Sequence, residues 1–204
     1  DKKKKKKALQ LVECIFDSIF GSIGEFIGNM FTNLLNNVLN GAHPFKDYWS
    51  ISGPILDYIQ ALIFLIFGIN WISYVLHSLI LNIIVVSISF YFFQKLKINN
   101  YYAFCYSLSI AILAYPQTGT PFMDHHAFYF AYLSIIFFSL GILNNRKLFW
   151  FFIPITLFIS FFSKQIPSSY ILVLLLIFLI YYLIINKVKA KNTIKGLSFG
   201  TITI

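Results

Sequence analysis

Long, nearly uninterrupted apolar segments constrain this chain more than any other feature. Trp71–Gln94 is the clearest, and Pro167–Asn186 consists almost entirely of Ile, Leu, Val, Phe and Tyr. A helix that crosses a membrane needs about 20 mostly apolar residues. Three further segments approach that length: Tyr101–Tyr115, Ala127–Leu143 and Leu148–Ser163. The pattern therefore predicts several membrane-spanning helices.

The composition favours a lipid environment and excludes other classes of protein. Of the 204 residues, 58% are hydrophobic and 11% are charged, and the mean hydropathy is +0.75. A soluble globular chain is about 45–50% apolar and about 25% charged, and a disordered chain has few aromatic residues. The apolar runs lack the alternation of a membrane barrel, and helices pair their own backbone amides in lipid. We therefore expect an all-α, polytopic transmembrane helical bundle.

Two segments before Trp71 are less apolar. Ile55–Phe67 is too short to span comfortably, and Pro54 suits the first turn of a helix. We expect a short interfacial helix there, in the first outer loop. The expected organisation is a basic N-terminus with a weak first transmembrane or amphipathic helix over 1–40, an extracytoplasmic loop over 41–70 and a truncated transmembrane bundle over 71–204.

The distribution of positive charge predicts the orientation. The proposed crossings are at about residues 8–30, 71–94, 101–115, 124–143, 148–163 and 167–186. With these crossings, 14 of the 16 Lys and Arg residues fall on one side, and only Lys46 and Lys164 fall on the other. The positive-inside rule makes the basic side cytoplasmic. We expect an integral protein of the plasma or inner membrane with a cytoplasmic N-terminus. Nucleic acid is not an expected partner, because the charges lie at the ends of apolar runs and not on one face.

Most ionisable residues outside the basic clusters fall in three loops on the opposite, extracytoplasmic side. The loops are Gly41–Gly53, Pro116–His126 and Ser163–Ser169. Their candidate binding or catalytic residues are His43, Lys46, Asp47, Asp124, His125, His126, Lys164 and Gln165. Ionisable groups at membrane depth are costly and usually functional. The asymmetry therefore points to chemistry or binding on the outer surface.

Each of these residues also has a structural interpretation. Asp47 is equally a solvated turn residue, and Asp124 suits the cap of the following helix. His125 and His126 have a composition that suits a divalent metal, but adjacent residues do not share a helix face and no third spaced ligand is evident. Lys164 serves either as an interfacial anchor or as a positive charge for a phosphate.

Two polar residues fall inside an apolar segment. His77 and Asn82 lie within Trp71–Gln94. Polar side chains in such segments commonly hydrogen-bond across helices. We expect them to be interhelical hydrogen-bond partners and not ligands.

The segment GAHPFKDYWSISGPILDYIQALIFLIFG resembles a motif that follows the first span of GT-C-type membrane glycosyltransferases. The relevant branch is the glycosyltransferase 39 type, which uses polyprenyl-phosphate sugars. The later Asp-His-His and Ser-Lys-Gln segments are similar to what such proteins show after their third and fifth spans. The resemblance covers about residues 41–186, and its Pro44–Pro54 part is the most specific.

The resemblance implies sugar transfer on the extracytoplasmic face from a polyprenyl-phosphate sugar, the donor substrate, to a glycan, lipid or protein acceptor. Asp47 matches the acidic residue that acts as base or orients the acceptor hydroxyl. Lys164 matches a basic residue suited to the lipid phosphate, and Asp124 and His125 would line the acceptor region, with a divalent metal left open. The chain would then be the N-terminal portion of such an enzyme.

Two other functions remain open from the sequence. One is a transporter or flippase for a lipid-linked or polar solute. Transporters place polar groups near the membrane midplane and often contain inverted repeats, whereas the polar groups here lie at the ends of the apolar segments and no repeat is evident. The other is a non-catalytic membrane subunit.

Overall fold

Helices form nearly all of the regular structure in the computed structural model. The structure describes residues 38–48, 53–115, 119–186 and 190–204. Its named helices are α2 (Pro54–Phe67), α3 (Trp71–Lys95), α4 (Asn100–Leu113), α5 (Met123–Asn144), α6 (Lys147–Ser163), α7 (Gln165–Ile185) and α8 (Ala190–Ile202). Within these ranges the one β-type contact is an isolated bridge between Pro44 and Tyr48. The expectation of an all-α chain is confirmed for the described residues.

Three of these helices are long and apolar enough to cross a membrane: α3, α5 and α7. The apolar helices α2 and α6 are shorter, at 14 and 17 residues. Each lies where the sequence predicts a helix, and so does α4. The expected first helix and the lysine run that precedes it lie outside the described residues.

Short polar turns set the helix ends. The Asn70 side chain caps α3 by accepting a hydrogen bond from the backbone N–H of Ser73 at 2.8 Å. The Asn99 side chain accepts in the same way from Tyr101 at the start of α4. Such caps satisfy N–H groups that have no partner inside the helix. They fix where the chain leaves one helix and enters the next.

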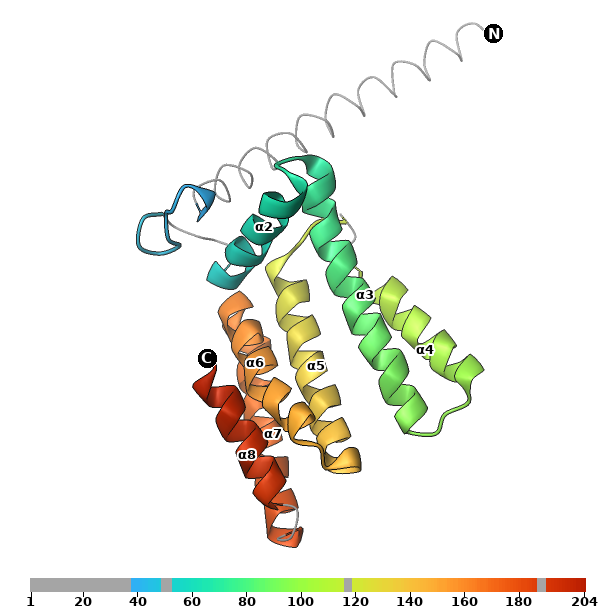
Figure 1. The fold of residues 1–204 in the computed structure, drawn as a ribbon. Coiled ribbons are helices and arrows are strands. Elements are labelled where there is room, and N and C mark those ends of the chain that lie inside the picture. Colours follow the sequence, from blue (N-terminus) through green and yellow to red (C-terminus); the bar gives the residue numbers. More distant parts are fainter. Residues whose placement is uncertain (1–37, 49–52, 116–118, 187–189) are drawn as a thin grey trace, which may run out of the picture.

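The helices run up and down, so that alternate connections lie at opposite ends (Figure 1). At one end lie α2, the segment 38–48, the start of α5 and the end of α6. The connections from α3 to α4 and from α5 to α6 lie at the other end and carry Lys95, Lys97, Arg146 and Lys147. The acidic and histidine-containing loops are therefore separated from these basic residues by the length of the helices.

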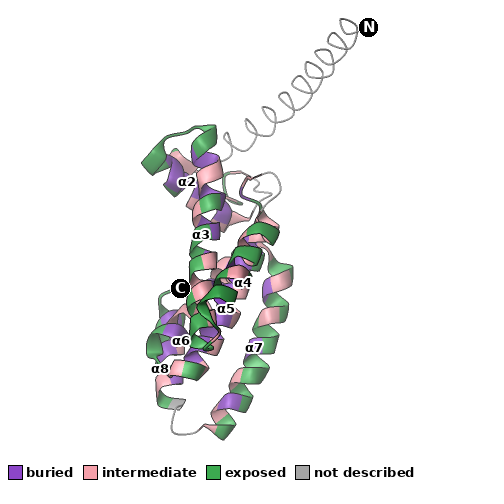
Figure 2. Cartoon of the chain, turned by 90° about the vertical axis from the view of Figure 1, so that its right-hand side faces the viewer, coloured by how far each residue is buried: buried purple, intermediate pink, exposed green. Residues whose placement is uncertain are grey.

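The core lies mainly between α5 and α6. Trp150 is fully buried, and its ring contacts Phe138 edge-to-face at 5.5 Å between centroids. Gly141 makes room for this ring, because a Cβ there would lie 2.8 Å from the indole. Eleven residues of α5 are buried, but only three of α7, whose largely exposed surface is visible in Figure 2. A helix with so many exposed apolar side chains suits contact with lipid or further helices.

Hydroxyl groups connect the two central helices. Ser160 on α6 donates to the backbone carbonyl of Ala127 on α5 at 2.7 Å. One turn earlier on α6, Thr156 shares a hydrogen bond of 2.8 Å with Ser134 on α5. Small and hydroxylated residues let apolar helices approach closely and exchange hydrogen bonds. The register of α5 against α6 is set by these contacts.

Helix α8 is not among the helices predicted from the sequence. This helix packs on α6, with Gly196 and Gly200 facing the α6 backbone. A Cβ at Gly196 would lie 2.7 Å from the carbonyl oxygen of Lys147. The Gly196–Gly200 spacing is the sequence signal for such close helix packing, but the segment is too polar to stand out by hydropathy.

Candidate functional site

An ion pair between Asp124 and Lys164 marks the end of the bundle that carries the acidic loops. Asp124 lies in the first turn of α5, and Lys164 is the single residue between α6 and α7. The Lys164 ammonium group donates to the Asp124 carboxylate. The two side chains are 35% and 46% exposed, for Lys164 and Asp124 respectively. Both groups are therefore accessible to a ligand that approaches from this end.

The expected helix cap at Asp124 is not formed. Phe122 occupies the N-cap position of α5, and no side chain caps this helix. The Asp124 carboxylate still lies at the positive end of the helix dipole. It accepts instead a charge-assisted hydrogen bond from the Lys164 ammonium group.

A largely apolar cavity of about 520 Å³ adjoins this ion pair. It lies between the end of α4 and the start of α5, and Asp124 and His125 are among its lining residues. The remaining lining residues are mostly apolar: Ser109, Ile110, Leu113, Ala114, Phe128 and Tyr132. The Nδ1 atom of His125 is buried and has no hydrogen-bond partner in the described structure. The cavity thus combines an apolar wall with a rim that carries the Asp124 carboxylate and the His125 imidazole.

The segment 38–48 places Asp47 in a tight turn. The Asp47 carboxylate accepts a hydrogen bond from the backbone N–H of His43 at 2.8 Å, and Phe45 has a positive φ of 65°. The His43 Nδ1 atom lies 3.1 Å from the Tyr58 hydroxyl on α2. Asp47 and Lys46 are exposed. The structural interpretation of Asp47 as a turn residue is therefore correct, and its exposure leaves a catalytic role open.

The start of α2 connects this segment to the ion pair. Gly53 packs so closely on α6 that a Cβ would lie 2.6 Å from the carbonyl oxygen of Phe162. Phe162 is two residues before Lys164. No hydrogen bond or ion pair joins Asp47 to Asp124 or Lys164 among the described residues. The structure thus brings Asp124, His125 and Lys164 together and leaves Asp47 at the same end without direct contact.

A second contact holds the segment 38–48 to α2. The Tyr48 hydroxyl donates to the Asp57 carboxylate at 2.9 Å. Burial, together with the hydrogen bond and the charge of Asp57, raises the pKa of the Tyr48 phenol well above its usual range. The phenol therefore stays neutral at any physiological pH and remains a donor. Asp57 is only 3% exposed and was not a sequence candidate.

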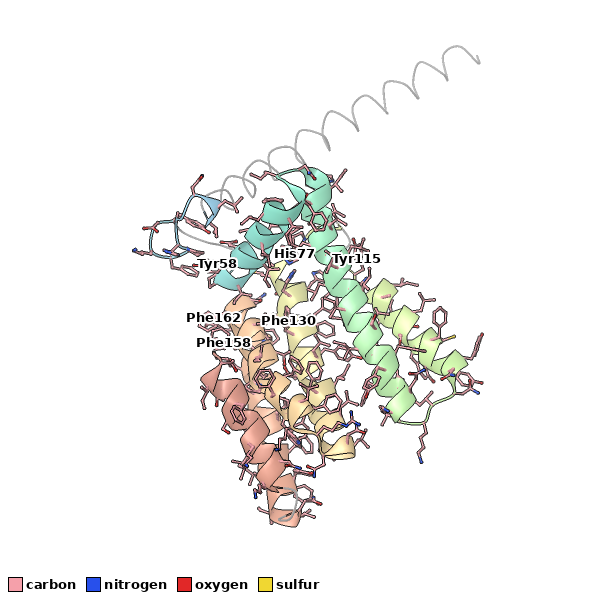
Figure 3. All side chains as sticks on the ribbon, in the orientation of Figure 1. Tyr58, His77, Tyr115, Phe130, Phe158 and Phe162 are labelled. Carbon is pink, nitrogen blue, oxygen red and sulfur yellow. The ribbon has the colours of Figure 1, made fainter. Side chains whose placement is uncertain are left out.

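A buried chain of polar side chains runs from α2 through α3 to α5, and the sequence did not predict Gln60 as a member or His126 as an interior residue. His77 on α3 contacts Gln60 on α2 at 2.7 Å and His126 on α5 at 2.8 Å. Figure 3 shows His77 at the level where α2 crosses the bundle. The expected interhelical role of His77 is confirmed, and Asn82 likewise donates to Ala111 on α4 at 3.1 Å.

His126 and Gln165 differ in their surroundings. His126 is 1% exposed, and its two ring nitrogens contact His77 and the backbone carbonyl of Phe122 instead of the cavity beside the ion pair. Gln165 is exposed at the start of α7, beside Lys164. Adjacent histidines thus have separate surroundings, since His125 lines the cavity. This separation follows from the 100° turn between neighbouring residues of a helix.

The described residues contain no group of three or more His, Cys, Asp and Glu side chains placed to hold a metal ion. Comparison of the chain with protein-family models, curated proteins and solved structures finds no match. The candidate site therefore has to be interpreted from its own geometry.

Proposed function

We propose that this chain is part of a polytopic membrane glycosyltransferase that transfers a sugar from a polyprenyl-phosphate donor to an acceptor on the extracytoplasmic face. Three helices that are long and apolar enough to span a membrane support the membrane location. The observation that carries the proposal is the Asp124–Lys164 ion pair at the rim of the apolar cavity. A donor of this class is complementary to this site: its apolar chain suits the cavity, and its anionic phosphate suits the Lys164 ammonium group.

In this proposal the Lys164 ammonium group binds the donor phosphate. Lys164 is held at the rim by Asp124, and its side chain is partly exposed. When the sugar–phosphate bond breaks, the bonding electrons leave with the phosphate, and a nearby ammonium group offsets the charge that develops. The apolar side chains of α4 and α5 in the cavity wall contact part of the isoprenoid chain. Ser109 and His125 supply polar atoms near that wall.

Asp47 takes the role of general base or acceptor-orienting group. Its carboxylate is exposed, and the His43 N–H holds one of its oxygens. The acceptor hydroxyl gives its proton to Asp47 as its oxygen forms the new bond to the sugar carbon. A carboxylate has to lie within hydrogen-bond reach of that hydroxyl. The acceptor therefore has to bridge Asp47 and the ion pair.

His43, Lys46 and Gln165 are proposed to contact the polar parts of donor or acceptor. His43 and Lys46 belong to the same turn as Asp47, and Gln165 follows Lys164 directly. A divalent metal remains an open component of the acceptor region. The basic end of the bundle faces the cytoplasm in this proposal, and anionic membrane lipid is its partner.

The test is transfer of labelled sugar from a polyprenyl-phosphate donor by the full-length protein in lipid vesicles. Asp47→Asn and Lys164→Ala should each lower turnover strongly. Lys97→Ala, at the opposite end of the bundle, is the matched control for loss of a lysine and should leave turnover unchanged. Unchanged turnover in both site variants refutes the assignment.

The same vesicles distinguish the enzyme from a transporter or flippase. A transporter would accumulate a polar solute, or move a labelled lipid between leaflets, without any sugar transfer. Such movement in the absence of a donor, combined with no transfer in its presence, would replace the proposed activity.

A further inference from the structure

The contact between His77 and His126 places two imidazole nitrogens unusually close together in a buried site. Their Nε2 atoms lie 2.8 Å apart, and the rings meet edge-to-face. Both side chains, and Gln60 beside them, are at most 2% exposed. Two nitrogens that ligate one tetrahedral Zn²⁺ ion at about 2.0–2.1 Å lie about 3.3 Å apart. The shorter separation leaves room for a proton and not for a metal ion.

The partners of the two Nδ1 atoms determine how many protons the pair carries. Nδ1 of His126 lies 3.0 Å from the backbone carbonyl of Phe122, which only accepts, so this nitrogen donates. The Gln60 amide directs its nitrogen to the carbonyl of Ser73 and its oxygen to Nδ1 of His77. In this orientation of the amide, Nδ1 of His77 donates as well.

A neutral imidazole has only one N–H. With both Nδ1 atoms protonated, two neutral rings would present bare Nε2 atoms to each other at 2.8 Å, and their lone pairs would repel. One additional proton between these atoms turns the repulsion into a charge-assisted hydrogen bond. With the amide in this orientation, the pair requires one extra proton.

A neutral arrangement also exists, and it requires one local change. If the Gln60 amide turns over, its NH₂ group donates to Nδ1 of His77, whose proton then sits on Nε2 and is donated to His126. The hydrogen bond to the Phe122 carbonyl is retained. Only the contact of Gln60 with Ser73 is lost; at 3.5 Å it is the longest of the four contacts made by Gln60, His77 and His126.

We propose that Gln60, His77 and His126 form a binding site for a single proton, and that release of this proton turns the Gln60 amide over. The site is separate from the proposed sugar-transfer site. It joins α2 to α3 and α5, because each helix contributes one member. The hydrogen bond from a charged His77 to Gln60 is stronger than its neutral counterpart. Proton binding therefore holds α2 more firmly on the bundle.

The ionisable groups around the pair come from four elements. Asp57 on α2 and Tyr74 on α3 interact with each other, and both are buried. On α5, His125 is the neighbour whose charge acts on His126. The nearby charges from Asp124 and from Lys164, after α6, are paired with each other. The helices α4 and α7 contain no Asp, Glu, Lys, Arg or His.

The test is nitrogen NMR on the whole chain, labelled with ¹⁵N-histidine, in lipid nanodiscs. We expect a scalar coupling between Nε2 of His77 and Nε2 of His126, carried by the proton between them. As the pH is lowered, the pair should take up one proton and not two, and Nδ1 of His77 should change from a bare to a protonated nitrogen. His43→Gln removes an exposed histidine outside the pair and should leave the coupling intact. Gln60→Leu should retain the coupling between the Nε2 atoms. Because it removes the hydrogen-bond partner of His77 Nδ1, the protonation of that nitrogen should no longer depend on the orientation of an amide.

Two results would overturn the proposal, and the unaltered protein supplies both readouts. One is the absence of coupling with independent titration of the two histidines. The other is a coupling that persists without any proton uptake, which would mean a permanently neutral pair. The link to α2 is tested by amide hydrogen exchange in Pro54–Phe67, corrected for its intrinsic pH dependence. Exchange should be slower in the protonated protein, and His77→Gln should abolish the difference; an equal difference in both proteins rejects the link.

Discussion

Lys164, where α6 ends, forms an ion pair with Asp124, which lies 40 positions earlier in the first turn of α5. Water reaches both side chains, since they are 35% and 46% exposed. Exposed pairs of this kind contribute only about 0.2–1 kcal/mol to stability. The pair therefore places charge at the rim of the cavity and contributes little to holding the fold together.

The first prediction separates these two roles. Lys164→Met and Asp124→Asn should each change the free energy of unfolding by no more than about 1 kcal/mol. Sugar transfer by Lys164→Met should fall about 100-fold or more, because the charge on the leaving phosphate is no longer offset. Unfolding in detergent, followed by circular dichroism, and the vesicle transfer assay measure the two quantities. If the variants lose activity and their free energy of unfolding also falls by several kcal/mol, the role of the ion pair is structural.

The second prediction concerns the contact of α2 with α6. Gly53 has a φ of 78°, and a Cβ there would lie 2.6 and 2.7 Å from the carbonyl oxygens of Phe162 and Ser163. Gly53→Ala should therefore displace α2 and accelerate hydrogen exchange throughout Pro54–Phe67. Gly41→Ala is the matched control, because Gly41 also has a positive φ but no atom within 4 Å of the added Cβ. It should incur only the backbone strain, about 1–2 kcal/mol. Equal effects of both substitutions would rule out the steric contact as the cause.

The third prediction concerns the hydroxyl contacts between α5 and α6. Ser160 is fully buried and donates to the carbonyl of Ala127. Ser160→Ala should lower the free energy of unfolding by about 0.6 kcal/mol and at most about 1.7 kcal/mol, the average and the maximum for hydrogen bonds between membrane helices. Ser139→Ala should have a smaller effect, since the Ser139 hydroxyl bonds only within its own helix, to Ile135. Unfolding in mixed micelles measures both, and a larger loss for Ser139→Ala would contradict the prediction.

The fourth prediction concerns the packing of α8 on α6. Gly200 lies against Phe151 and Pro154, with no room for a side chain. Gly200→Leu should detach α8, which limited proteolysis between α7 and α8 would detect as faster cleavage. Ser198→Leu adds a leucine to the exposed side of the same helix and should leave the cleavage rate unchanged. Protection of the Gly200→Leu variant equal to that of the unaltered chain would show that the contact is dispensable.

The positions of the helices were predictable because the signals are local. The apolar segment Trp71–Gln94 becomes α3, and Asn70 and Asn99 are the cap residues that hydropathy alone does not locate. α8 was missed because its packing depends on Gly196 and Gly200, which carry no hydrophobic signal. The grouping of the outer-loop residues at one end of the bundle was also predictable, since helices that run up and down bring alternate loops together.

The candidate site was predictable only in part. Asp124, His125 and Lys164 were expected at the same end of the bundle, and the structure places them together around one ion pair and cavity. The prediction that Asp124 caps α5 is wrong. His126, which was also expected at the site, faces the interior. Nothing in the spacing of Gln60 and His77 indicates their contact, because they are 17 positions apart with a turn between them. The catalytic role of Asp47 stays a prediction.

The helical class, the positions of α2 to α7 and the separation of the basic from the acidic end follow from the sequence alone, because the length of an apolar run and the charges that flank it are local properties. The contacts of His77 with His126 and of Lys164 with Asp124 arise only when the helices pack together. Helices such as α3, α5 and α7 are apolar on nearly every face. Their sequences carry no amphipathic stripe that identifies the buried side, so the rotation of each helix is set only by packing against its neighbours.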